Sequence, residues 1–280
     1  MNAEIRRILR RNLEEIEPSR RAGEALYEGT LAELAKFASG DDPAAAFREI
    51  SDMPLCSAEF ARFCRMTAGG ITDPLILAKF LPDQSAAEDI PSDTRTAYLR
   101  NAYTDRAFAA FSREIHRLSA QYQTSFSAGC EEVYYGRCSY CILPIRNSED
   151  GTLSSFTRMI TKYDLKIARV CDITTQDGDS TMRYALLRRG LDLHAPQDGF
   201  LQTTLLLPGA VSIGTFLHAA EYTGASAEKI ATIPLQYTSD RTSLNITFRI
   251  NRESTAPLLL FLGAVAESCT TDGIYTLHGA

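Results

Sequence analysis

The residues best suited to chemistry lie in the stretch YCILPIRNSEDG, residues 140–151. An apolar run typical of a strand gives way here to Arg146, Asn147 and Ser148. A helix is expected directly after this turn, and the free N–H groups of a helix N-terminus favour an anion. Arg183, later in the chain, carries a guanidinium that can hold a carboxylate through two parallel hydrogen bonds. Together these residues predict a binding site for a small carboxylate.

The same residues also have an explanation that needs no ligand. Arg146, Asn147 and Ser148 would form a capped turn, and Arg183 would pair with an Asp or Glu of the protein itself. No acid suited to proton transfer is evident beside them in the sequence. The sequence leaves both interpretations open.

Composition and charge exclude several classes of partner. The chain has 280 residues, with 29 basic and 35 acidic side chains and a net charge of −6. This balance speaks against a nucleic-acid partner, which needs a concentrated basic face. The N-terminal segment lacks the apolar core of a signal peptide, and the longest apolar run, residues 257–266, is too short to cross a bilayer. We therefore expect a cytoplasmic protein with no membrane partner.

Cysteine and histidine do not indicate a metal or redox site. Seven cysteines in a chain without a secretion signal predict free, mostly buried thiols. Cys138 and Cys141 have the redox spacing, but residues three apart on a strand point to opposite faces, and no second pair completes a zinc site. No histidine has a cysteine or carboxylate at a catalytic spacing in the sequence. We therefore predict no metal and no cofactor, and structural roles for His116, His194, His218 and His278.

Three parts are predicted along the chain, and the fold class is α+β. Apolar residues at helical spacing indicate short helices before residue 81, one opened by Ser57 and another capped by Asp73, and residues 81–95 have the composition of a linker. Strands then alternate with helices in an α/β layer, and the last part has the βαββαβ order of a ferredoxin-like fold. The expected parts are 1–93, 94–193 and 194–280. The expected strands are 96–99, 139–145, 166–173, 182–188, 201–207, 229–237, 244–250 and 274–277, and the expected helices of the last two parts are 105–119, one through 156–163, 212–222 and 255–269.

Several partial motifs, in order, resemble the prephenate dehydratase family over residues 94–280. The stretch YCILPIRNSEDG is similar to the family's "GVVPIENSxxGxV" segment, and STMRYALL at 180–187 to its "TRFxVL" strand. LPGAV at 207–211 and KIATIP at 229–234 stand where the family's ACT domain has "KPGAL" and "IESRP". The resemblance implies a reduced dehydratase-like α/β domain followed by an ACT-like domain. It assigns substrate binding to Asn147, Ser148, Gly151, Arg183 and Arg146, and effector binding to Pro208, Gly209 and Ala210.

The departures from the family pattern concern catalysis. Arg146 replaces the glutamate of "ENS", and Met182 stands at the position of the family's catalytic threonine. Thr181, one residue earlier, is the candidate that remains. Between residues 173 and 181 the chain has only a turn where the family places most of its second lobe. The resemblance therefore implies a protein that has lost the catalytic cleft.

These expectations favour a non-enzymatic protein of aromatic amino-acid metabolism. It would bind a small carboxylate or an aromatic amino-acid-like ligand, act in regulation, and form a homodimer through the ACT-like domain. Two alternatives stay open. One is an active, divergent dehydratase that converts prephenate to phenylpyruvate, water and CO2, and the other is a structural scaffold with no ligand.

Overall fold

The computed structural model describes most of the chain after residue 56. The described residues are Pro18, 57–81, 94–149, 151–174, Gly178, 180–193, 196–209, 211–233, 241–266 and 268–279. The helices predicted before residue 57 and nearly all of the expected linker lie outside the described residues.

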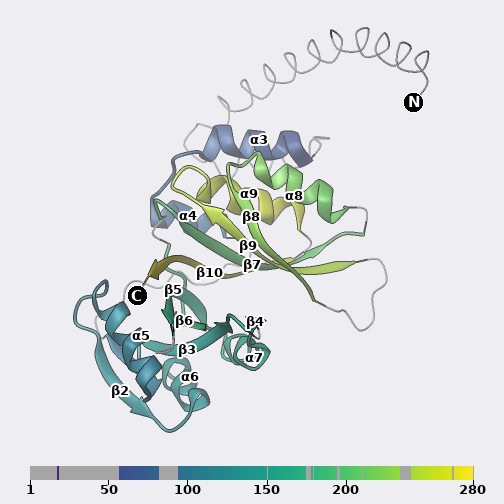
Figure 1. Cartoon of the computed structure of the whole chain (residues 1–280). Coiled ribbons are helices and arrows are strands. Elements are labelled where there is room, and N and C mark those ends of the chain that lie inside the picture. Colours follow the sequence, from purple (N-terminus) through teal and green to yellow (C-terminus); the bar gives the residue numbers. More distant parts are fainter. Residues whose placement is uncertain are drawn as a thin grey trace.

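The fold is α+β, as predicted, and it is organised by one mixed sheet (Figure 1). In the described part of the chain ten strands join in the order β2-β1-β3-β6-β5-β10-β7-β9-β8, with β4 paired to β3. The strands are β1 Arg95–Leu99, β2 Ser119–Gln123, β3 Tyr140–Asn147, β4 Gly151–Thr152, β5 Lys166–Thr174, β6 Thr181–Arg188, β7 Gly199–Leu207, β8 Ser226–Ile233, β9 Thr242–Ile250 and β10 Ser268–Gly279.

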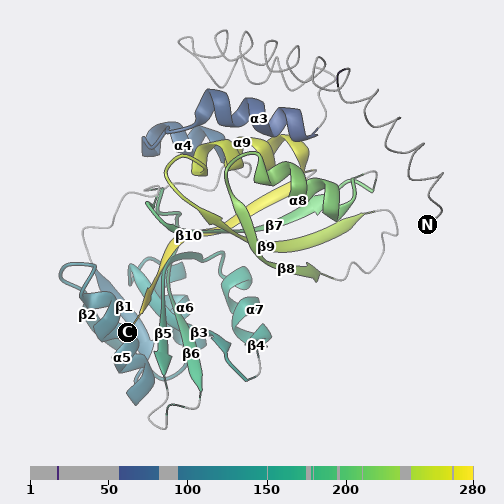
Figure 2. The same ribbon diagram turned by 45° about the horizontal axis from the view of Figure 1, so that its top comes forward.

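The half of the sheet formed by β1, β2, β3, β5 and β6 has helices on both faces (Figure 2). Alternate residues of β3 enter different cores, since Cys141 and Leu143 pack with α6 and α7 while Tyr140 and Ile142 pack with α5. We call these the α7 face and the α5 face. The helices are α5 Ala102–Ser112, α6 Phe126–Tyr134 and α7 Ser154–Lys162.

The last part of the chain has the predicted ferredoxin-like arrangement. β7, α8, β8, β9, α9 and β10 follow one another, and their four strands pair antiparallel in the order β10-β7-β9-β8. Alternate residues of β7 and β9, such as Leu201 and Phe248, point into a core beneath the helices. Figure 1 shows α8 and α9 on one side of these strands. The helices are α8 Ile213–Glu221 and α9 Thr255–Val265.

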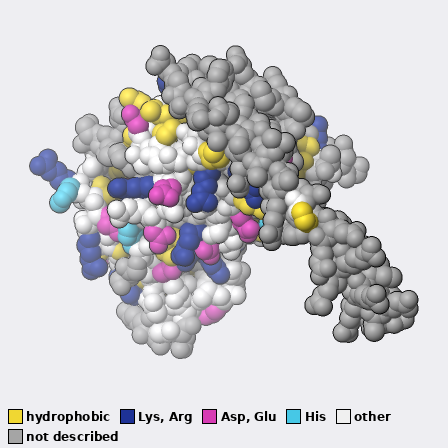
Figure 3. All heavy atoms as spheres, turned by 90° about the horizontal axis from the view of Figure 1, so that it is seen from above, with side chains coloured by type: hydrophobic (Ala, Val, Ile, Leu, Met, Phe, Trp, Pro, Cys, Tyr) yellow, Lys and Arg dark blue, Asp and Glu magenta, His cyan; other side chains and the backbone are white. Residues whose placement is uncertain are grey.

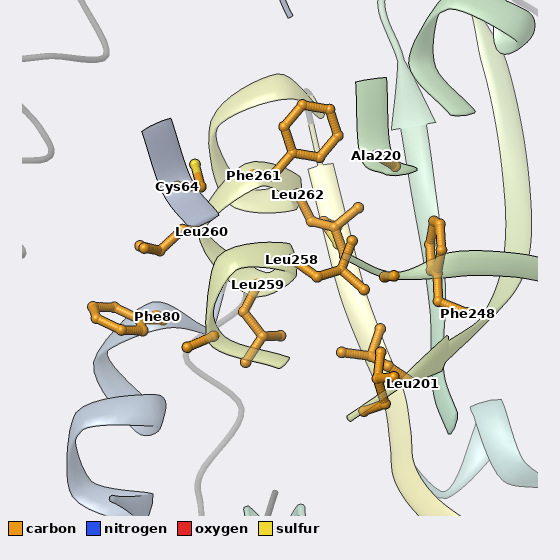
Figure 4. Close-up of a cluster of buried hydrophobic side chains, with 14 of the residues drawn as sticks. Cys64, Phe80, Leu201, Ala220, Phe248, Leu258, Leu259, Leu260, Phe261 and Leu262 are labelled. Atoms are coloured by element: carbon orange, nitrogen blue, oxygen red, sulfur yellow. The ribbon is translucent and has the colours of Figure 1, made fainter. Parts of the chain in front are cut away.

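Helix α9 is covered on both sides, which explains its uniformly apolar sequence. All residues from Thr255 to Leu262 are buried. Leu258 and Leu262 point to the sheet, while Leu260 points outward to Cys64 and Phe80 (Figure 4). The outer layer is formed by α3 Ser57–Ala68, which lies over α8 and α9 in Figures 1 and 2, and by α4 Pro74–Phe80, which lies beside α9. Each fully buried Leu or Phe stabilises such a layer by about 1.5–3 kcal/mol.

Strand β10 joins the two halves of the sheet. Residues 268–275 pair antiparallel with β7, and residues 273–279 pair parallel with β5. The crossing point is Gly273, where an added Cβ would lie 2.6 Å from the carbonyl oxygen of Ile167. Glycine is therefore required by the close approach of the two backbones. The division of the chain at residues 93 and 193 stays a prediction.

Most predicted elements are present, and their caps follow the sequence. Asp73 caps α4 by accepting a hydrogen bond from the Leu75 N–H at 2.9 Å, and Pro74 is the first helical residue. The prediction of one helix over residues 105–119 was wrong, because α5 ends at Ser112 and β2 begins at Ser119. Neither β2 nor α6 was predicted.

Three further predictions had wrong ends. The helix predicted for 255–269 ends at Val265, because Ala266 is extended and Cys269 belongs to β10. The strand predicted for 229–237 begins earlier, at Ser226, and its described part ends at Ile233. The closing strand is much longer than 274–277, because it pairs with two partner strands in succession.

Candidate anion site

The turn of YCILPIRNSEDG is a hairpin between β3 and β4. Arg146 pairs with Thr152 and Asn147 with Gly151. Gly151 has a φ of +76°, a left-handed conformation that favours glycine. The Asn147 side-chain oxygen accepts a hydrogen bond from the Glu149 N–H at 3.2 Å, which closes the turn on itself.

Ser148 is used to hold this hairpin against β6. Its N–H donates to the Thr181 carbonyl oxygen at 2.9 Å, and its hydroxyl accepts from the Thr181 N–H at 2.9 Å. The expectation of a helix directly after Ser148 was wrong, because β4 intervenes and α7 begins only at Ser154. Asn147 and Ser148 therefore form the capped turn of the alternative interpretation.

Arg183 is occupied by a carboxylate of the protein. Its Nε donates to Asp172 Oδ1 at 2.7 Å and its Nη2 to Oδ2 at 2.8 Å, the bidentate geometry that suits a guanidinium. This pair raises the pKa of Arg183 above its usual value. The structure thus gives Arg183 an internal partner, as the alternative interpretation expected.

Three cations nevertheless meet beside this pair. Arg146 lies directly opposite Arg183 across β3 and β6, and Thr152 lies opposite Arg146 on its other side. From β8, in the other half of the molecule, the Lys229 Nζ donates to the Thr152 hydroxyl at 2.5 Å. We call Arg146, Arg183 and Lys229 the cationic cluster.

The charge of the cationic cluster is only partly balanced. Within the described part of the chain, Asp172 pairs with Arg183, while no carboxylate pairs with Arg146 or Lys229. Lys229 is exposed as a residue, but its ammonium group lies against Thr152. Partial burial, followed by the charges of Arg146 and Arg183, lowers the pKa of Lys229. An anion placed among these side chains would remove that repulsion.

A buried phenol borders the cationic cluster. Lys229 lies opposite Thr247 on β9, which in turn lies opposite Gln202 on β7. The Tyr275 hydroxyl donates to the Gln202 side-chain oxygen at 3.4 Å. Burial raises the pKa of Tyr275 to about 12, so its hydroxyl keeps its proton and stays a hydrogen-bond donor.

The predicted catalytic positions do not form an acid–base site. Thr181 lies two residues before Arg183 and therefore shares its face of β6. Met182 packs into the core on the α5 face. Asp172, the carboxylate beside this face, is engaged by Arg183. Thr181, Met182 and Asp172 therefore supply no placed proton donor for the loss of a hydroxyl group.

The predicted effector residues lie elsewhere. Pro208 and Gly209 form a turn in which the Val211 N–H donates to the Pro208 carbonyl oxygen at 2.9 Å. This turn follows Leu207, five residues along β7 from Gln202 and the row of Lys229. Ala210 lies outside the described residues. The structure thus does not bring this turn to the cationic cluster.

Sequence reasoning missed Lys229 and Tyr275 as site residues. Both belong to the ferredoxin-like part, and only the pairing of β10 with β5 brings that part beside the hairpin of Arg146. Neither the order nor the spacing of the motifs predicts that pairing.

The other sequence predictions concern thiols, metals and surface charge. The described cysteines are free and buried: Cys64, Cys130, Cys138, Cys141, Cys171 and Cys269. Over the described ranges, no group of three or more His, Cys, Asp or Glu could hold a metal ion. No helix in those ranges is long and apolar enough to cross a membrane. On the face seen in Figure 3, basic and acidic side chains are interspersed.

The fold and site thus define an α+β protein with a cationic cluster at the junction of two sheet halves. No protein-family model matches the chain, and no curated protein matches it. Among solved structures it is similar to GqqA, described as a novel type of quorum-quenching acylase, with 16% identity, a TM-score of 0.49 and coverage of 66% of this chain and 96% of that one. It is also similar to the prephenate dehydratase of Streptococcus mutans, with 16% identity, a TM-score of 0.49 and coverage of 66% of this chain and 99% of that one.

A prephenate dehydratase of Arthrobacter aurescens in complex with L-Phe gives 13% identity, a TM-score of 0.47 and coverage of 65% and 90%. These are similarities of fold at low sequence identity. Membership of the prephenate dehydratase family stays a prediction.

Proposed function

We propose that the protein binds a small carboxylate at the cationic cluster and does not dehydrate it. The observation that supports this most directly is the meeting of Arg146 and Lys229 at Thr152, from strands in opposite halves of the sheet. Like charges held close together destabilise the protein. A ligand carboxylate between them converts this repulsion into two attractions and adds charge-assisted hydrogen bonds.

The neighbouring groups favour a ligand with further polar atoms. The Thr152 hydroxyl, the Gln202 amide and the Tyr275 hydroxyl lie on the same side of the sheet as the cations. Phe200 stacks on Tyr275 with ring centroids 5.7 Å apart and offers a partly exposed aromatic surface. These features support an aromatic amino-acid-like carboxylate, which is also what the family resemblance implies. A regulatory role in aromatic amino-acid metabolism is the corresponding hypothesis.

Binding without turnover is favoured over dehydration by what surrounds Arg183. Its guanidinium is held by Asp172, and the adjacent Met182 has no group that could transfer a proton. Dehydration needs an acid near the leaving oxygen and water excluded from the reaction. The active dehydratase and the ligand-free scaffold are therefore treated as outcomes of the test.

The test combines thermal unfolding with an activity assay on the full chain. Thermal unfolding is measured with phenylpyruvate, prephenate, phenylalanine or acetate added separately. In the sample with prephenate, the formation of phenylpyruvate is followed as well. A ligand at a hundred times its dissociation constant should add about 2.7 kcal/mol of stability. Lys229→Gln should remove this gain, while the matched variant Lys79→Gln, at an exposed position of α4, should keep it.

Each outcome decides between the three interpretations. Stabilisation that is lost only in Lys229→Gln, without product, supports the binding protein. Product that disappears in Arg183→Ala would restore the dehydratase. If neither stabilisation nor product is observed, the interpretation that remains is a structural scaffold with no ligand.

Self-association through the ferredoxin-like part belongs to the same proposal. The helices α8 and α9 are covered by α3 and α4, so the edge strand β8 is the surface that we assign to a second copy. All residues of β8 are exposed, and among the described strands β8 pairs only with β9. Unpaired edges readily accept another strand. Sedimentation should show a dimer that Ile230→Lys dissociates and that the exposed-residue control Leu75→Lys leaves intact; a monomeric wild-type protein would contradict this.

A further inference from the structure

We propose that Thr276, His278 and Glu114 form a hydroxyl–imidazole–carboxylate triad that hydrolyses small, activated carboxylic esters. The Thr276 hydroxyl hydrogen-bonds His278 Nε2. On the other side of the ring, His278 Nδ1 lies 2.7 Å from Glu114 Oε1. This order of contacts is the one that nucleophilic catalysis requires, with the base in contact with the nucleophile and oriented by a third group.

The fold brings the three residues together from distant parts of the sequence. Thr276 and His278 are two apart on β10 and so point to the same face. Glu114 follows α5, with its N–H donating to the Phe111 carbonyl oxygen at 3.1 Å. The triad therefore lies on the α5 face, whereas Tyr275 and the cationic cluster lie on the α7 face. The two sites are separate, and the triad does not rest on anion binding.

His278 has both a carboxylate and a hydroxyl partner, contacts that the sequence did not predict. Burial, followed by the charge of Arg169, lowers the pKa of His278. This shift favours the neutral imidazole, and the tautomer whose Nδ1–H donates to Glu114 leaves Nε2 to accept the Thr276 proton. Burial raises the pKa of Glu114, and Arg169 opposes that rise.

A cation stands beside the hydroxyl. Arg169 on β5 lies next to Thr276 in the parallel register of β5 and β10. Its Nη1 donates to Asp192 Oδ2 at 2.9 Å, and its Nε lies 3.8 Å from Glu114 Oε2. These two carboxylates hold the guanidinium in place. Arg169 can therefore stabilise negative charge that develops on an oxygen near Thr276.

The triad is open to solvent and small molecules. The side chains of His278 and Glu114 are 32% and 28% exposed. Cys171, which lies beside His278 in register, is a poor rival nucleophile because it is buried and burial raises its pKa to about 12. Thr276 is therefore the nucleophile that His278 can activate.

The reaction has two balanced steps. First, Thr276 Oγ1 attacks the ester carbonyl carbon while its proton passes to His278 Nε2, and the carbon–oxygen bond to the leaving alcohol breaks as His278 returns the proton to it. Second, a water molecule gives a proton to His278 and attacks the threonyl ester. The acid is released, and His278 returns the proton to Thr276. The net reaction is ester and water to acid and alcohol.

The first experiment measures p-nitrophenyl acetate hydrolysis by the full chain. We expect a rate above buffer that falls about a hundredfold in the near-isosteric variant Thr276→Val and in His278→Gln, in line with the usual contribution of a positioned base. The matched variant His218→Gln should keep the rate, because His218 is an exposed residue of α8 that contacts Tyr222 and not the triad. No rate above buffer, or an unchanged rate in Thr276→Val, overturns the proposal.

The second experiment separates catalysis from a merely structural hydrogen bond. A fluorophosphonate should phosphonylate Thr276 with loss of fluoride, and peptide mapping should locate the adduct there. Thr276→Ser keeps the hydroxyl and should keep the adduct even if Thr276→Val fails to fold. An adduct at another residue, or none in the wild-type protein, refutes a nucleophilic Thr276.

Discussion

Reversing one charge in the cationic cluster should stabilise the protein while removing its ligand. Arg146→Glu places a carboxylate opposite Arg183 and near Lys229, where the wild-type protein has a third cation. Opposed cross-strand pairs contribute about 0.2–1 kcal/mol, with like charges destabilising and opposite charges stabilising. Since Arg146 is exposed, water screens these charges, and the lower part of that range applies to each change of sign.

Two such changes of sign give a gain of about 0.5–1 kcal/mol in the free energy of unfolding. For a chain of this size the midpoint of thermal unfolding should rise by about 1–3 °C. The gain should shrink in 0.5 M salt, because exposed charges are then screened over a few ångströms. The carboxylate-induced stabilisation of about 2.7 kcal/mol at a hundred times the dissociation constant should disappear.

Scanning calorimetry with and without phenylpyruvate measures both effects. The matched reversal is Arg113→Glu at the C-terminus of α5, where a carboxylate faces the negative end of the helix and should cost about 0.3–1 kcal/mol. The two reversals should therefore shift the unfolding midpoint in opposite directions. A midpoint that falls equally in both variants, or a ligand effect that survives Arg146→Glu, would refute the cationic cluster as an anion site.

Two further predictions concern pH and the outer helical layer. The pKa of Lys229 is lower in the folded protein than in the unfolded chain, so the unfolded chain holds this proton more tightly. The free energy of unfolding without ligand should therefore rise as pH increases from below the folded pKa towards 10.5. The stabilisation by a carboxylate ligand should fall over the same pH range. Chemical denaturation at a series of pH values measures both, and in Lys229→Gln both pH dependences should vanish. Phe63→Ala should lower the free energy of unfolding by about 3–5 kcal/mol, because this fully buried ring holds α3 against α8 and α9. A loss below 1 kcal/mol in urea unfolding would show that α3 contributes little to the core.

The predicted elements failed where apolar periodicity continued past the end of a helix. Ile115 and Leu118 keep the helical spacing of α5 and pack on the same core, yet they lie in the turn after Ser112. Arg117 in that turn has a φ of +67°, which no α-helix contains. The strand that follows, β2, is a mostly exposed edge strand with no apolar alternation. The spacing of apolar residues therefore indicated neither the end of the helix nor the start of the strand.

The long apolar helix α9 was predicted because its own residues form an apolar run. The helices that cover its outer side were not predicted to do so. The run from residue 257 to 266 specifies a buried helix, but not what buries its outer side. That role belongs to Phe63, Cys64 and Phe80, on helices nearly two hundred residues earlier in the chain. Contacts of this range depend on topology, which composition and periodicity do not encode.

Site prediction was limited in the same way. Asn147, Ser148 and Arg183 were chosen for their chemical types, and the structure commits all three to internal hydrogen bonds. Arg146 was also chosen by type, and it has no carboxylate partner among the described residues, as is true of Lys229. Its partner Lys229 and the triad of the α5 face both depend on β10 pairing beside β5. Sequence motifs do not contain that pairing.

A test of this dependence is available at the crossing point of β10. Gly273→Ala places a Cβ 2.6 Å from the Ile167 carbonyl oxygen and 2.7 Å from the Ile167 Cβ, closer than real contacts allow. The two strands must separate, which should cost about 1–3 kcal/mol. Because β10 carries both Tyr275 and the His278 side of the triad, the carboxylate-induced stabilisation and the ester hydrolysis should weaken together.

The matched substitution is Gly214→Ala in α8, where an added Cβ meets nothing within 4 Å. Alanine is the better helix former, so this variant should gain about 0.5–1 kcal/mol and keep both activities. Urea unfolding, ligand-induced stabilisation and p-nitrophenyl acetate hydrolysis are measured on the two variants in parallel. If Gly273→Ala loses stability but retains both functions in full, then the junction of β10 with β5 holds the fold together without positioning either site.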